Sequence, residues 1–250
     1  MSEFFLFIAV GFAAQLVDGA IGMAYGLVST STLLSFGIPP ATASASVHAA
    51  EVFTTGASGL SHWRLKNIDW KLVKRLAPAG MLGGFLGAYI LATNASTWLS
   101  LAIAFYLVIM GAVVLRKGLR RFMSNPHQPK HVPVIGFFGG LLDAIGGGGW
   151  GPLVTTNLLG QGTQPRMAIG STNLAEFFVT FTISCTFLLT IGLELWPIIT
   201  GLIIGGVIAA PIAAYAAKYV PARILMVAVG LIIMGLSLRT IVISGEGLLW

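Results

Sequence analysis

A run of 40 residues without a single Asp, Glu, Lys or Arg, from Leu76 to Leu115, most constrains what this chain can fold into. Its length is enough for about two crossings of a hydrocarbon core roughly 30 Å thick. Charged residues make up only 9% of the 250 residues, against about 25% in soluble domains, and the mean hydropathy is +0.90. A water-exposed surface cannot be built from this composition. The sequence therefore predicts an all-α polytopic membrane protein.

The basic residues gather in short loops between the apolar runs and account for the formal net charge of +6. Such loops follow the positive-inside rule of membrane proteins. No basic stripe interleaved with aromatic residues stands free of these loops, so we expect the lipid bilayer as a partner and no nucleic acid. Cys185 is the single cysteine, so one chain cannot form a disulfide or a thiolate metal site.

The region from Gly136 to Phe178 opens with 8 glycines in 16 residues, interrupted by one acid, Asp143. A glycine inside a helix costs roughly 1 kcal/mol relative to alanine. Such a density is kept where the backbone must bend or come close to another group. We therefore expect a break between two short helices here, with a ligand nearby.

The same pattern occurs 125 residues earlier, because Gly11–Thr55 aligns with Gly136–Thr180 at 17 identical positions of 45. Half of the chain is thus an internal duplication whose period is too long for a solenoid. The equivalent positions that matter below, some with changed residues or past a one-residue slip, are Asp18/Asp143, Gly22/Gly147, Tyr25/Trp150, Gly26/Gly151, Thr30/Thr155, Pro40/Pro165, Ser46/Ser171, His48/Asn173, Glu51/Glu176 and Gly80/Gly206.

Loop charge predicts how the two halves are oriented. The basic stretches 64–75 and 116–131 are expected in the cytoplasm, whereas the loop 192–196 has an acid and no cation and is expected outside. Because 192–196 is the repeat counterpart of 64–75, the halves are inverted, an arrangement common among secondary transporters. Both chain ends are then periplasmic.

The predicted organisation is a pair of inverted membrane repeats with about eight to ten membrane segments in all. Their boundaries are a first repeat over 1–115, a cytoplasmic basic linker over 116–132 and a second repeat over 133–250.

Each repeat is expected to open with a broken or re-entrant helix. Phe4–Val17 is short for a crossing, the run breaks at Asp18-Gly19, and a second apolar run covers Ala20–Phe36. Whether the first segment of each repeat spans the bilayer stays open. Backbone interrupted at membrane depth must be buried in protein or line a cavity.

Two pairs of equivalent acids are candidate functional residues. Glu51 and Glu176 lie in helices expected inside the membrane, where a carboxylate is costly and is by default a functional candidate. We interpret them as proton-coupling residues, with capping of a neighbouring backbone break as the alternative. Asp18 and Asp143 are interpreted as helix-break residues, because Asp accepts the free N–H groups at the start of a helix.

Small polar side chains near these acids offer neutral donors for an oxyanion. Helix starts at the glycine breaks would add N–H groups and the positive end of a helix dipole. The same residue types also hold membrane helices together, so a structural role stays open for each of them. The predicted substrate-binding residues are Ser46, His48, Ser171, Thr172, Asn173, Gly22 and Gly147.

The chain lacks the motifs of common enzyme classes, namely G-x-S-x-G, H-E-x-x-H and the phosphate loop. His48 and Glu51 are three residues apart and could ligate a metal, but the second half offers Asn173, a poor ligand for transition metals. We therefore expect no enzyme, no cofactor and no resident metal. A channel or carrier for another small solute, and an intramembrane metalloenzyme, stay as alternatives.

Several stretches of the first half also follow a family pattern. They are the glycine-rich start after Gly19, the turn LLSFGIPP, the Ala- and Ser-rich helix and the exit HWRLKNIDW at 62–70; the second copy ends similarly, in Gly-Ser-Thr-Asn-Leu. In these features the chain resembles the TauE/SafE sulfite exporter family over nearly its whole length. The resemblance implies an inner-membrane permease that exports sulfite, an organosulfonate or a related small sulfur anion. A homo-oligomer is compatible with it.

Overall fold

The computed structural model describes all residues except 1, 95–96, 120–128, 217–221 and 247–250. The described part is helical and has no strand, which confirms the predicted all-α class. Its elements are α1 (Ser2–Ile21), α2 (Tyr25–Ser35), α3 (Pro40–Arg64), α4 (Trp70–Thr93), α5 (Thr97–Leu119), α6 (Val132–Gly146), the π-helical turn η1 (Gly151–Thr155), α7 (Thr156–Gly160), α8 (Pro165–Thr190), α9 (Trp196–Ala216) and α10 (Ala222–Glu246).

The first helix break lies between α1 and α2, later in the chain than the predicted break at Asp18-Gly19, which was wrong. Helix α1 continues through Gly19 because this glycine lets α9 approach: a Cβ atom there would lie 2.6 Å from the Ala213 Cβ. The chain turns instead at Gly22, whose φ of 70° is a conformation that glycine adopts without steric cost.

The second break has the same construction. Helix α6 ends at Gly146, Gly147 has a φ of 65°, and the chain resumes in η1 and α7. The break that the sequence predicts between two short helices in this glycine-rich region is therefore confirmed, and it lies between Gly146 and Gly151. A proline at the second position of η1 is tolerated because the first N–H groups of a helix have no partner inside it.

The basic loop predicted over 64–75 is shorter than expected. Asp69 caps α4 by accepting the Lys71 N–H at 2.8 Å, so residues 70–75 are already helical. The predicted linker 116–132 is also helical at its start, because α5 runs to Leu119. Residues 120–128 of this linker lie outside the described residues.

Six of the described helices are long and apolar enough to cross a membrane, namely α1, α4, α5, α8, α9 and α10. Helix α6 is apolar but shorter, and α3 has 25 residues but is too polar to qualify. Large apolar side chains such as Leu189 and Trp98 are exposed on the outer helices, as expected of lipid-facing surfaces. The protein is therefore a polytopic membrane protein.

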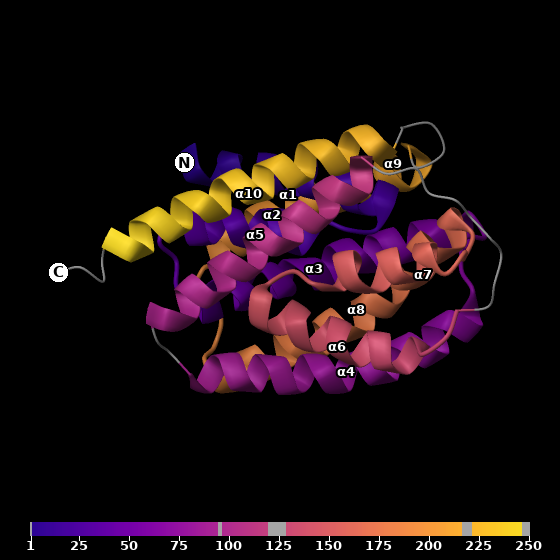
Figure 1. The fold of residues 1–250 in the computed structure, drawn as a ribbon, viewed down its shortest axis with the longest axis horizontal. Helices are drawn as coiled ribbons and strands as arrows, with labels where there is room; N and C mark the ends of the chain where they lie inside the picture. The colour runs from indigo at the N-terminus through magenta and orange to yellow at the C-terminus, as the bar shows by residue number, and fades with distance from the viewer. Residues whose placement is uncertain (1, 95–96, 120–128, 217–221, 247–250) are drawn as a thin grey trace.

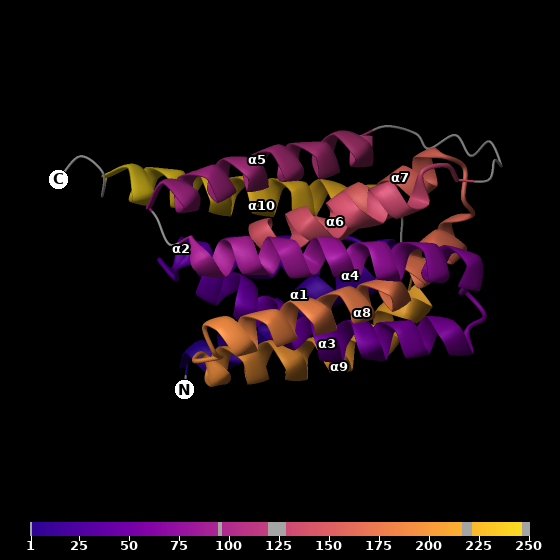
Figure 2. The same ribbon diagram turned by 90° about the horizontal axis from the view of Figure 1, so that it is seen from below.

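The helices pack in pairs that match between the two halves. Helix α1 packs on α9 and its counterpart α6 packs on α4, while α3 meets α8 and α5 meets α10. Figures 1 and 2 show α5 and α10 side by side along one side of the molecule.

Glycines repeat this correspondence at atomic level. Gly80 receives the ring of Trp150, and its equivalent Gly206 receives the ring of Tyr25, with 2.6 and 3.2 Å between the ring and a Cβ placed on each glycine. Such reciprocal contacts are what a two-fold relation between the halves produces.

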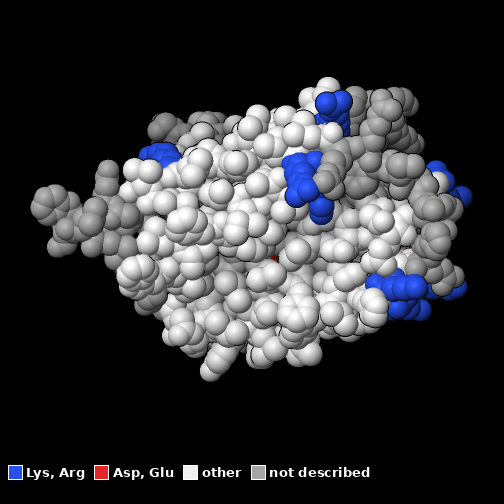
Figure 3. Space-filling model, viewed as in Figure 1, with Lys and Arg blue, Asp and Glu red and all other residues white. Residues whose placement is uncertain are grey.

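Most basic residues lie away from the start of α1 and the end of α10. These two helix ends lie toward the left of Figure 1, whereas most of the Lys and Arg atoms visible in Figure 3 lie toward the right. Acid atoms are almost invisible on the face drawn in Figure 3. The acids that the sequence places in the membrane are buried, with at most 5% of their surface exposed.

Candidate functional site

The two glycine breaks meet inside the molecule and hold each other. Thr30 Oγ1 donates to the Gly147 carbonyl at 2.6 Å, and the equivalent Thr155 Oγ1 donates to the Gly22 carbonyl at 2.7 Å. Both carbonyls belong to irregular backbone, which is tolerated at membrane depth only with partners inside the protein. Each half therefore satisfies the broken helix of the other.

A small cavity lies where these breaks meet. Its volume is about 10 Å³, which is room for about one water molecule. Glycine backbone from both breaks forms part of its wall. Four carboxyl groups complete the lining and have between 2% and 5% of their surface exposed: Asp18, Glu51, Asp143 and Glu176. We call these four residues the acid site.

Asp143 is anchored to the start of the helix that follows its break. Its Oδ1 atom accepts the N–H groups of Gly149 at 2.7 Å and Trp150 at 3.0 Å. Asp18, its equivalent, accepts one longer bond of 3.5 Å from the Tyr25 N–H, and its Oδ2 has no hydrogen-bond partner among the described residues. Both contacts are of the kind that a helix-break role requires, and both acids also line the cavity.

His48 lies between one acid of the first half and one acid of the second half. Its Nε2 lies 3.3 Å from Asp143 Oδ2 and 3.8 Å from Glu51 Oε2. Its Nδ1 lies 2.8 Å from the Ser44 carbonyl oxygen. The imidazole is fully buried, and it brings an acid of α3 and an acid of α6 to one point.

The acid site has little positive charge to balance it. In the described part of the chain, the two close contacts between a basic side chain and a carboxylate both involve His48, and neither involves Lys or Arg. Glu51 Oε2 has no hydrogen-bond partner there although the residue is 2% exposed. Uncompensated carboxylates in a low-dielectric interior repel one another strongly. The site is therefore suited to take up protons or cations.

The predicted oxyanion donors do not line the cavity, and their bonds run either within one helix or between elements. Ser46 bonds the Thr42 carbonyl of its own helix, and Ser171 accepts the Asp69 N–H at 2.7 Å. The Thr172 hydroxyl oxygen lies 3.0 Å from that of Thr155.

Asn173 belongs to the same group of predicted donors. Its Oδ1 accepts a bond from Ser58 at 2.8 Å, and its Nδ2 donates to the Ile169 carbonyl at 3.0 Å. In this closed arrangement the seven predicted substrate-binding residues do not line the cavity. Their substrate role stays a prediction.

The proximity of Asp143 to His48 and Glu51 is the site feature that sequence reasoning missed. Asp143 is 95 positions from His48 and 92 from Glu51, and the sequence pattern predicts it as a helix-break residue. The duplication held a usable signal, because a two-fold relation across the breaks brings an acid of one half beside the polar helix of the other.

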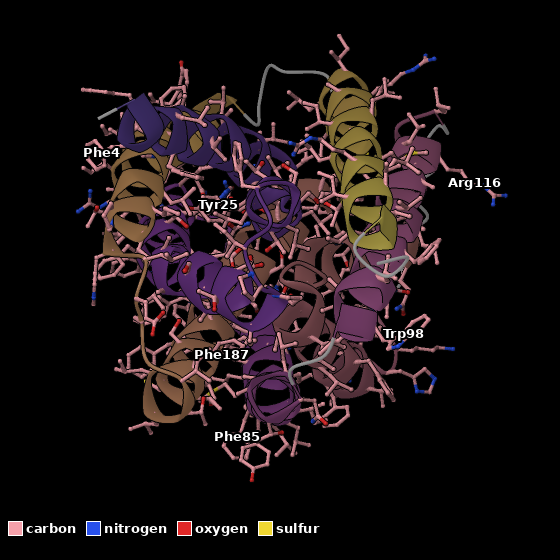
Figure 4. All side chains as sticks on the ribbon, turned by 90° about the vertical axis from the view of Figure 1, so that its left-hand side faces the viewer. Phe4, Tyr25, Phe85, Trp98, Arg116 and Phe187 are labelled. Atoms are coloured by element: carbon pink, nitrogen blue, oxygen red, sulfur yellow. The ribbon has the colours of Figure 1, made fainter. Side chains whose placement is uncertain are left out.

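Two large aromatic residues are buried beside the helix breaks. Trp150 and Tyr25 are fully or almost fully buried; the Trp150 Nε1 donates to the Thr172 carbonyl and the Tyr25 hydroxyl to the Leu202 carbonyl, both at 3.2 Å. Figure 4 looks along the bundle and places Tyr25 in the interior, whereas Phe85 and Trp98 point outward. These rings pack and also bond across elements.

A polytopic bundle with buried acids at the meeting point of two broken helices defines a membrane transporter. The sulfite exporter TauE/SafE family matches residues 7–240, and the chain belongs to this family. It is 40% identical over 253 residues to the probable membrane transporter protein YtnM of Bacillus subtilis (strain 168), an alignment covering 97% of this chain and 84% of that protein. No solved structure matches the chain.

Proposed function

We propose that the protein is a secondary transporter that exports sulfite, an organosulfonate or a related small sulfur oxyanion across the cell inner membrane. Membership of the sulfite exporter TauE/SafE family supports the substrate class. The observation that carries the mechanism is the acid site. Its four acids line one cavity, to which both halves contribute at their broken helices. Secondary transporters with repeats place their site at this kind of interface.

Transport requires the halves to part. A cavity with room for about one water cannot hold sulfite, which has four heavy atoms. The reciprocal bonds of Thr30 and Thr155 lie next to this cavity and are the contacts that opening must break or shift. The closed arrangement then corresponds to the state between access from one side and access from the other.

An anion beside four carboxyl groups needs positive charge, which supports coupling to protons. The sequence hypothesis gives this role to Glu51 and Glu176 alike, and we now assign it to Glu176, because Glu51 lies beside His48 whereas Glu176 does not. The other charged groups facing Glu176 are Asp18 of α1, Glu51 of α3 and Asp143 of α6. A protonated Glu176 repels an arriving anion less, which links anion binding to proton binding.

Flux measurements on the purified chain in proteoliposomes test this function. We expect saturable efflux of sulfite or a short alkylsulfonate, accelerated by a pH gradient. Glu176→Gln should keep anion exchange and lose the effect of the gradient, while Glu194→Gln, an exposed acid of the loop before α9, should behave as wild type. Conductance without saturation would indicate a channel, and no flux of any sulfur anion would contradict the proposal.

Direction and membrane placement need separate tests. Cells lacking the protein should accumulate sulfite while degrading an organosulfur compound if the transporter exports it. For topology, Lys66→Cys and Glu194→Cys are placed singly in a Cys185→Ser background. An impermeant maleimide added outside should label only the second, since we propose that the basic loops are cytoplasmic and the chain ends periplasmic. Labelling of both loops from the same side would contradict the inverted repeats.

A further inference from the structure

Three atoms of the kind that bind metals converge at one edge of the acid site. They are His48 Nε2, Glu51 Oε2 and Asp143 Oδ2, and all three lie within 4.8 Å of one another. His48 and Glu51 stand one helical turn apart on α3, while Asp143 comes from α6 of the other half. Each of the three residues has at most 2% of its surface exposed.

Hydrogen bonding orients the imidazole with a lone pair toward the acids. A carbonyl oxygen can only accept, so the 2.8 Å contact between His48 Nδ1 and the Ser44 carbonyl places the ring proton on Nδ1. The Ser44 hydroxyl donates its one proton to the Ala144 carbonyl at 2.7 Å, so it does not donate a hydrogen bond to the ring nitrogen. In the neutral ring, Nε2 is then an acceptor. Histidines that bind metals commonly donate their other N–H to a backbone carbonyl in this way.

Each of the two carboxylates also has an oxygen atom that is free to bind a metal. The Gly149 and Trp150 N–H groups occupy Oδ1 of Asp143 and fix the carboxylate, leaving Oδ2 directed at His48. Glu51 Oε2 is buried, has no hydrogen-bond partner among the described residues and lies 3.8 Å from His48 Nε2. With the imidazole neutral, three acceptors thus face one another with no donor between them.

A metal ion accounts for this geometry better than a proton. One proton can bridge only one pair of atoms, and it would leave Glu51 Oε2 without a partner. An ion with bonds of about 2.0 to 2.1 Å in a tetrahedral site holds its ligand atoms about 3.3 Å apart. The observed 3.3 and 3.8 Å separations need little adjustment to reach this spacing. A charge of +2 also balances two carboxylates where Lys and Arg do not.

We propose that His48, Glu51 and Asp143 bind one divalent transition-metal ion of the Zn²⁺ type. One imidazole and two carboxylates suit Zn²⁺, Co²⁺ or Mn²⁺ better than Mg²⁺ or Ca²⁺, which prefer oxygen ligands alone. Three protein ligands leave a position open, and Glu51 and Asp143 both line the cavity. An oxygen of the transported anion binds at this position when the halves part; this second step rests on the proposed function, whereas the metal site does not.

Titration of the purified, EDTA-treated full chain with Co²⁺ tests the site directly. Four-coordinate Co²⁺ absorbs visible light far more strongly than Co²⁺ in water, so binding is seen without any transport assay. We expect one ion per chain, displaced by Zn²⁺ and not by Mg²⁺. The decisive variant is His48→Asn, because Asn173 already occupies the equivalent place in the second half and the fold accommodates it there. It should weaken binding at least about 100-fold.

Further variants separate loss of a ligand from loss of fold. Glu51→Gln should also lose the Co²⁺ band, whereas Glu194→Gln, outside the site, should keep it. Zn²⁺ should raise the unfolding temperature of wild type and not that of His48→Asn. A Co²⁺ spectrum identical in wild type and a folded His48→Asn variant, or no band in wild type, would overturn the metal site. Metal binding together with sulfite flux that ignores Zn²⁺ removal would overturn only the anion step.

Discussion

The two halves of the molecule have the same buried acids, but the polar residues next to these acids differ. Glu51 in the first half has His48 one turn away, whereas Glu176 in the second half has Asn173 at that place. His48 reaches across to Asp143. Asn173 instead accepts a bond from Ser58 and helps to hold α8 against α3.

This difference separates what the duplication preserves from what it changes. Bonds from a threonine side chain to the backbone of the opposite break are kept in both copies: Thr30 on Gly147 matches Thr155 on Gly22. The polar residue beside the glutamate is the part that differs. A symmetric scaffold therefore carries an asymmetric site, with a metal-type cluster on one side and an acid suited to protons on the other.

The largest expected effect tests the symmetric part. A Cβ atom at Gly26 would lie 2.8 Å from the Gly147 carbonyl oxygen, and one at the equivalent Gly151 would lie 2.6 Å from the Gly22 oxygen. Gly26→Ala and Gly151→Ala should each lower the free energy of unfolding by about 3 kcal/mol, because backbone cannot easily yield. Thermal unfolding in detergent measures this. Gly160→Ala, with open space around it, is the control, and an effect at only one break would contradict the reciprocity.

The next effect sharpens the difference between the two aspartates. Asp143→Ala removes two short bonds to buried N–H groups and should cost about 2 to 3 kcal/mol, since bonds to charged groups are the stronger kind. Asp18→Ala removes one bond of 3.5 Å and should cost less than about 1 kcal/mol. Denaturant or thermal unfolding compares the two. Equal losses would mean that the aspartates anchor their helices alike.

The smallest effect returns to the threonines. Thr30→Val and Thr155→Val each leave a buried glycine carbonyl without its partner, at a cost of about 1 kcal/mol. Thr155 also bonds Thr172, so its replacement should cost slightly more. Thr200→Val, an exposed residue bonded within its own helix, should change stability little. If the opening of the halves limits the rate, both buried variants should also alter flux, which stopped-flow efflux would detect.

Much of the fold could be predicted because its signals are local. The uncharged run from Leu76 to Leu115 indicated membrane helices, and the glycine stretches indicated two breaks. The exact break in the first half was wrong because helix ends depend on tertiary packing: Gly19 looks like a breaker, yet its contact with α9 keeps it helical. The early start of α4 depends on one capping side chain, Asp69, which was read as part of a loop.

The candidate site was only partly predictable because it depends on contacts between distant segments. The four acids were singled out one by one from their membrane setting and their duplication, and they line one cavity. Which acid faces His48 depends on how the two breaks interlock, and that register has no local signature. The sequence therefore indicates His48 and Glu51 as a possible ligand pair, but it does not indicate that Asp143 completes the cluster.

The polarity of α3 has a consequence for how the protein is made. This helix carries His48, Glu51 and a series of Ser and Thr residues, and it is too polar to rank among the candidate membrane spans. Its main neighbours are α8 and α9, which are synthesised more than a hundred residues later. The polar residues of α3 therefore gain these neighbours only after most of the second half has been synthesised. A chain that ends before α8 would leave this polar helix without its two main packing partners.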